Sequence, residues 1–85
     1  MISVRLLGHI RTSVGREMVE IEEGDIDAAQ LVERLRSMSI EREPGFTPFN
    51  TLVMVEDGEA YVPAKTGKRI ASGQRVVLIP FSHGG

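Results

Sequence analysis

The chain has 85 residues, a length that suits one domain whose core is large enough to fold alone. It contains no cysteine, which excludes a disulfide framework, a thiolate metal site and a thiol nucleophile. A formal net charge of −2 and an aromatic content of 5% disfavour a nucleic-acid-binding surface. The sequence shows neither a signal peptide nor a stretch long enough to span a bilayer. We therefore expect a single cytoplasmic domain over residues 1–85 that contacts neither nucleic acid nor membrane.

Two strands are predicted at the N-terminus. Residues 2–6 alternate apolar and polar side chains, which is the period of a half-buried strand, and residues 18–21 show a similar pattern. Gly15 lies in the polar connection between them, so the two segments are predicted to form a hairpin. We expect His9 to be solvated in that connection.

One amphipathic helix is predicted from about Asp27 to Met38. Asp27 can cap its N-terminus with Gln30 reaching back, and Ile26 and Leu31 are placed to pack across the cap. The apolar residues at helical spacing on one face are Ala28, Leu31, Val32, Leu35 and Met38.

Several acidic residues around the start of this helix resemble a metal-binding cluster. They are Glu20, Glu22, Glu23, Asp25 and Asp27. Negative side chains are favourable near the positive end of a helix dipole, so we interpret them as part of the helix start and of a solvated face. No metal site is predicted.

The C-terminal half is predicted to contain a loop and further strands. Residues 39–50 are interrupted by prolines and a glycine, which indicates a loop from which Phe46 and Phe49 fold back onto the core. Residues 52–55 and 60–62 flank Asp57-Gly58, a strong hairpin signal.

The last strand is predicted at the centre of the sheet. Residues 76–79 follow a turn at Ser72-Gly73-Gln74 and are apolar at successive positions, as is typical of a strand covered on both faces. A parallel partner needs a long crossover, so the first strand is its natural neighbour. These elements predict an α+β fold, the β-grasp, with a mixed sheet and one main helix.

The sequence ends in Gly84-Gly85, shortly after this strand and Pro80. Residues without a Cβ can thread a narrow enzyme channel, so the terminal carboxylate could be the reactive group. Pro80 has no N–H to donate, and we expect it to end the strand ladder and leave residues 81–85 as a flexible tail. Phe81 is either a docking anchor or folded back into the core. The simpler interpretation of the tail is a frayed terminus.

The order and spacing of these motifs resemble a known family. The Asp57-Gly58 hairpin, the Ser72-Gly73-Gln74 turn, the apolar strand, Pro80 and the terminal diglycine are similar to those of the ubiquitin-like sulfur carriers of the MoaD and ThiS type. The chain also resembles the ubiquitin-related modifiers and the archaeal-type small modifiers. The ending His83-Gly84-Gly85 is most similar to that of the ubiquitin-related modifiers.

The resemblance implies that an E1-like adenylating enzyme activates Gly85 with ATP and magnesium. The chain itself would bind no cofactor and would be a substrate, not an enzyme, or the small subunit of a synthase complex. A sulfur donor enzyme would convert Gly85 to a thiocarboxylate for a sulfur-accepting synthase, or Gly85 would be joined to lysines of target proteins. The alternative is a β-grasp interaction module with a non-reactive tail.

The site residues that this interpretation predicts fall into two groups. Pro80, Phe81 and His83 are expected to dock on the partner enzyme. Lys65 and Lys68 are the only lysines, so they are the only side-chain amines through which this chain could itself be modified.

Overall fold

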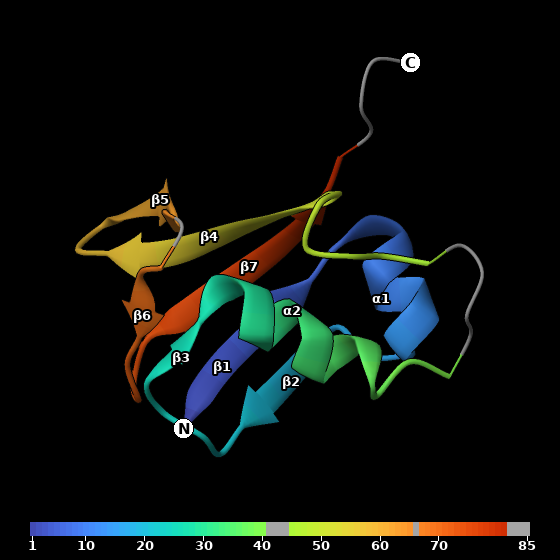
Figure 1. Cartoon of the computed structure of the whole chain (residues 1–85), viewed down its shortest axis with the longest axis horizontal. Helices are drawn as coiled ribbons and strands as arrows, with labels where there is room; N and C mark the ends of the chain where they lie inside the picture. Colours follow the sequence, from blue (N-terminus) through green and yellow to red (C-terminus); the bar gives the residue numbers. More distant parts are fainter. Residues whose placement is uncertain (41–44, 66, 82–85) are drawn as a thin grey trace.

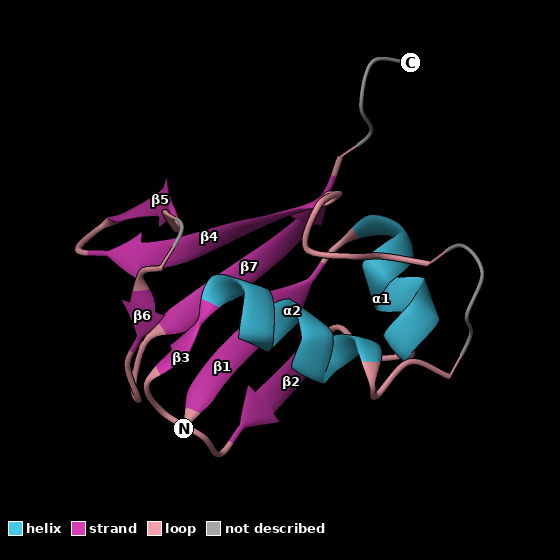
Figure 2. Ribbon diagram, viewed as in Figure 1, coloured by secondary structure: helices cyan, strands magenta, loops and turns pink. Residues whose placement is uncertain are grey.

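The computed structural model describes residues 1–40, 45–65 and 67–81. Its elements in chain order are β1 (Ile2–Leu6), α1 (Gly8–Val14), β2 (Met18–Ile21), β3 (Ile26–Asp27), α2 (Ala28–Arg36), β4 (Thr51–Asp57), β5 (Ala60–Pro63), β6 (Arg69–Ile70) and β7 (Arg75–Pro80). Figures 1 and 2 show α2 lying across one face of a twisted sheet. No helix in these described parts is long and apolar enough to cross a membrane.

Five strands form a mixed sheet in the order β2-β1-β7-β4-β5, and β3 pairs with β6 in a separate small sheet. β7 runs parallel to β1 and antiparallel to β4, which confirms its predicted central place. The β4–β5 hairpin turns through Gly58 and Glu59. Gly58 has a φ of 67° at the first turn position, as a type II′ turn requires.

The core lies between the sheet and α2. Leu31, Val32 and Leu35 of α2 are fully buried, which confirms the predicted inner face of the helix. Met38 is 42% exposed because the helix ends at Arg36, so its assignment to that face is wrong.

The predicted cap of α2 is confirmed. The Asp27 carboxylate accepts a hydrogen bond from the Gln30 N–H at 2.8 Å, and the Gln30 side chain accepts one from the Asp27 N–H at 3.2 Å. Two more residues of the acidic cluster form ion pairs: Glu23 with Arg34, and Asp25 with Arg69. Among the residues that the structure describes, no three His, Asp or Glu side chains are grouped to hold a metal ion.

The connection between β1 and β2 is a helix, α1. The prediction of a plain hairpin loop at this place, and of one helix in the chain, is therefore wrong. β1 and β2 do pair antiparallel. Between them α1 buries Ile10 and Val14, which lie one turn apart, and Gly15 ends it at a φ of 83° with its N–H bonded to the Arg11 carbonyl. His9 is half-buried with its Nε2 enclosed, so its predicted solvation is wrong.

Candidate functional site

The end of β7 is where the predicted tail begins. Pro80 is the last residue of the strand and pairs with Thr51 of β4. The Phe81 N–H then donates to the Asn50 carbonyl at 3.0 Å. Pairing therefore continues one residue past Pro80, which corrects the expectation that proline ends it. Proline removes only its own donor, and the next residue still has one.

The start of α1 packs against this strand end from one side. The Leu7 N–H donates to the Leu78 carbonyl at 3.2 Å. Gly8 has a φ of 57°, and a Cβ added there would lie 2.8 Å from the Pro80 Cγ. Both the backbone conformation and the close approach require glycine, so Gly8 lets α1 support the base of the tail.

Replacing Gly8 with alanine should lower the free energy of unfolding by about 1–3 kcal/mol, because the left-handed backbone and the approach to Pro80 both resist a Cβ. Denaturant melts measure the loss. Gly58→Ala is the matched control, since Gly58 has a φ of 67° with no atom within 4 Å of an added Cβ. An equal loss in both variants would show that the Pro80 contact has no effect.

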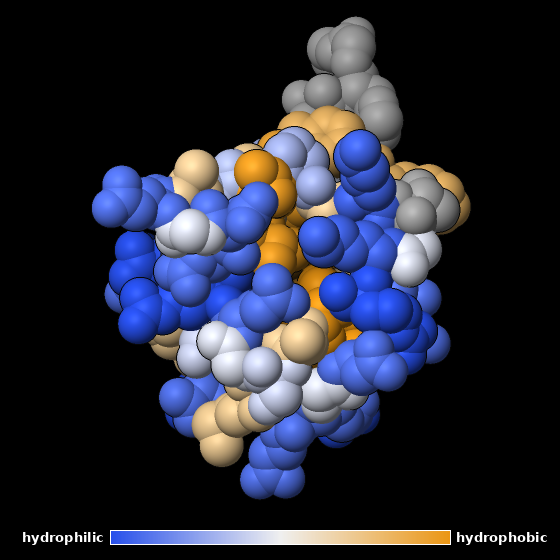
Figure 3. Space-filling view, turned by 90° about the vertical axis from the view of Figure 1, so that its left-hand side faces the viewer, coloured by the Kyte–Doolittle hydropathy of each residue, from blue (hydrophilic) through white to orange (hydrophobic). Residues whose placement is uncertain are grey.

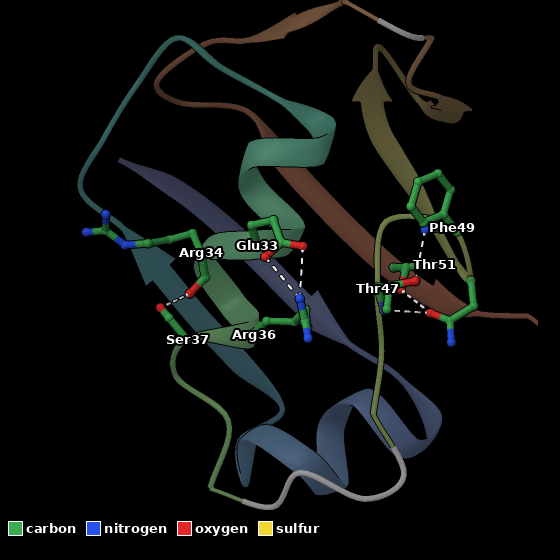
Figure 4. Close-up of polar contacts among 8 residues, drawn as sticks. Glu33, Arg34, Arg36, Ser37, Thr47, Phe49 and Thr51 are labelled. Carbon is green, nitrogen blue, oxygen red and sulfur yellow. Dashed lines mark hydrogen bonds and ion pairs between the residues drawn. The ribbon is translucent and has the colours of Figure 1, made fainter.

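The loop before β4 holds the strand end from the other side. The Asn50 Oδ1 accepts hydrogen bonds from the Thr47 N–H at 2.7 Å and from the Thr51 hydroxyl at 3.3 Å. The Thr47 hydroxyl oxygen accepts one from the Phe49 N–H at 3.1 Å (Figure 4). These side-chain oxygens satisfy backbone N–H groups within the turn, as Asn and Thr side chains commonly do. The loop is thereby fixed beside the Phe81 hydrogen bond.

The same loop exposes an aromatic side chain that sequence reasoning placed in the core. Phe46 is 1% exposed, as expected, but Phe49 is 81% exposed. Phe81 is 42% exposed, which excludes its full burial. Two aromatic side chains therefore lie at the base of the tail, and the turn-forming residues Thr47 and Asn50 were the sequence signal for the second one.

The other predicted site residues are placed as follows. Pro80 is half-buried, and Lys65 and Lys68 are exposed between β5 and β6. Phe81 and Lys65 line one groove together. His83, Gly84 and Gly85 lie outside the described residues.

The sheet face opposite α2 is partly apolar. Side chains alternate along strands, so the neighbours of the buried positions point to this face. The strand register places Val77 between Arg5 and Met54, and Ile79 beside Leu52.

This face also has a depression of about 400 Å³, which is lined by Arg5, Met18, Tyr61, Arg75 and Val77, among others. We call Val77, Ile79, Leu52 and Met54 the apolar stripe. Such a surface beside exposed cations is suited to a protein partner.

Two solved structures from Haloferax volcanii have the same fold. The crystal structure of SAMP1 from Haloferax volcanii matches with a TM-score of 0.66 and 20% identity, over 99% of this chain and 98% of that chain. The crystal structure of H. volcanii small archaeal modifier protein 1 matches with a TM-score of 0.65 and 19% identity, over 95% of this chain and 97% of that chain. The comparison confirms the predicted ubiquitin-like β-grasp fold. Neither a protein-family model nor a curated protein matches the sequence.

Proposed function

We propose, from the fold shared with the small archaeal modifier proteins, that this chain is a ubiquitin-like carrier or modifier whose Gly85 is activated by an E1-like enzyme. The observation that carries the proposal is the construction of the tail base. β7 is bonded on both sides, and its end is held between α1 and the Asn50 loop. A diglycine that follows a strand end held in this way can be presented to an enzyme in one direction.

The proposed chemistry lies at the Gly85 carboxyl carbon. A carboxylate is a poor electrophile, because attack adds negative charge to a group that is already anionic. In the activating enzyme, a Gly85 carboxylate oxygen would attack the α-phosphorus of ATP and release pyrophosphate. A sulfur nucleophile would then attack the acyl carbon and release AMP, which leaves a thiocarboxylate or a thioester. The chain would supply the acyl carbon and no acid or base.

The geometry requires the folded body to take part in docking. Residues 82–85 span about 13 Å when fully extended, so the tail reaches an active site only if the body lies against its rim. Ordering each tail residue costs on the order of 1–2 kcal/mol, which contacts of the body must offset. Phe81 and Leu52 are exposed, and the other residues of the apolar stripe are half-buried, so this surface can provide those contacts.

Two fates of the activated glycine remain compatible with the fold, and intact mass distinguishes them. The protein recovered from its native host should carry sulfur in place of one Gly85 oxygen, or should be found joined to other proteins through an isopeptide bond. Both forms arise from the same adenylate. A population that consists only of the free acid, under every growth condition tested, would favour the interaction module with a non-reactive tail.

Phe81→Ala should weaken association with the activating enzyme by more than about 1 kcal/mol, because exposed aromatic side chains at an interface centre contribute strongly to binding. The melting temperature should stay nearly unchanged, since the side chain is 42% exposed. A titration with the enzyme measures the affinity. Phe81→Leu, which keeps an apolar side chain, should lose less. Wild-type affinity of the alanine variant would remove Phe81 from the interface.

A further inference from the structure

An apolar groove separates the first turn of α2 from the sheet edge. It has a volume of about 550 Å³, and its walls include Ala28 and Ala29 on the helix side and Phe49 and Val53 on the sheet side. Figure 3 shows apolar surface running down the middle of this side of the molecule between hydrophilic flanks. On the helix side, the small side chains of the two alanines leave room in the groove wall.

The two ends of the groove differ in chemistry. Phe81 is hydrogen-bonded beside Asn50, on the β7 side of β4. Lys65 follows β5, on the opposite side of β4, and the β4–β5 pair is extended by the Ala64 N–H bond to the Val53 carbonyl. One end is therefore aromatic and the other end carries a cation.

At the cationic end Lys65 lines the groove and Lys68 lies next to it along the chain, and neither forms an ion pair with another described residue. The Lys68 N–H donates to the Lys65 carbonyl at 3.0 Å, so a tight turn holds both residues together. All four ion pairs found among the described residues use arginine. The one carboxylate in the groove wall, that of Asp27, accepts the Gln30 N–H at the positive end of α2. The ligand charge that complements this end is therefore negative.

We infer that this groove binds a partner protein through an apolar peptide segment flanked by acidic residues. The apolar side chains fill the space between Ala29 and Phe49, and the carboxylates face Lys65 and Lys68. The groove includes Leu52 of the apolar stripe and Phe81 at the tail base, whereas Val77 lines the depression on the other sheet face. The inference goes beyond the proposed function, because this binding uses neither Gly85 nor the activating enzyme.

A fluorescein-labelled synthetic peptide provides the test, with a run of valine and leucine followed by a run of aspartate. Anisotropy should show saturable binding to the wild-type protein, and the same peptide with lysine in place of aspartate should bind more weakly. Ala29→Glu should weaken binding by at least roughly tenfold, because it places a charge in the groove wall. Glutamate is favourable in the first turn of a helix, so the variant should fold.

Matched controls separate the groove from general charge effects. Ala60→Glu makes the same change at an exposed site at the β5 hairpin end and should bind like wild type. Lys65→Glu should weaken binding by roughly fivefold or more, whereas Arg16→Glu, an equal charge change at another exposed site, should not.

Several results would overturn the inference. They are equal binding of the aspartate and lysine peptides, wild-type affinity of Ala29→Glu, and amide NMR shifts that map to the sheet face instead of to residues 28–32 and 64–67. Sedimentation of the free protein as a dimer that Ala29→Glu dissociates would assign the groove to a second copy of the chain. Peptide binding without adenylation of Gly85 would contradict only the proposed function, and adenylation without peptide binding only this inference.

Discussion

Deletion of Gly85 should abolish ATP-dependent thiocarboxylate formation while leaving the melting temperature unchanged. The reacting carbon belongs to that residue, which follows the strand β7 and the Phe81 hydrogen bond that hold the end of the sheet. Each variant is incubated with the activating enzyme, ATP and a sulfur donor, and intact mass then reports whether one oxygen has been replaced by sulfur. An added residue after Gly85 should have the same effect, because it moves the carboxylate.

Gly84→Val tests whether the tail must thread a narrow channel. The carboxylate remains, but a β-branched side chain widens the tail and restricts its backbone, so we expect severe impairment. Ser82→Ala, a small change in the same tail, is the control and should be activated normally. Full thiocarboxylate formation on a chain that lacks Gly85 would contradict the carrier function.

Replacement of Leu35 with alanine should lower the free energy of unfolding by about 2–5 kcal/mol. Leu35 is fully buried between α2 and the sheet, and its truncation leaves a cavity that the surrounding core cannot fully close. Urea denaturation measures the loss, with an unchanged slope showing that the unfolded state is not altered.

Leu52→Ala is the matched control for this change. Leu52 is 37% exposed, so its truncation removes less buried apolar area and should cost clearly less. If the two variants lose equal stability, the inner face of α2 is no better packed than the sheet surface.

The changes of period in the sequence predicted the sheet and α2 well. The pattern at Asp27 and Gln30 predicts a helix cap, and the apolar run of β7 predicts a central strand. The structure confirms both. The helix α1 was missed because no side chain caps its N-terminus and it spans one short segment. Its signals were the spacing of Ile10 and Val14 and the glycine that ends it.

The candidate site was harder to predict than the fold. The base of the tail depends on contacts between segments far apart in sequence, Gly8 with Pro80 and Asn50 with Phe81. Local pattern rules carry no information on such pairs. Phe49 illustrates the same limit, because hydrophobicity favours burial while the hydrogen bonds of Thr47 and Asn50 decide where the loop points.

The parallel pairing of β1 and β7 determines how the molecule bears mechanical load. The paired residues run from Ser3 opposite Arg75 to Leu6 opposite Leu78. β7 ends at the opposite end of the sheet from the N-terminus (Figure 1). A pull between the N-terminus and the end of β7 therefore slides the two strands along each other. The hydrogen bonds between them resist together in shear, whereas bonds at a peeled strand end break in sequence. Tension on the β7 end is thus borne by the centre of the sheet.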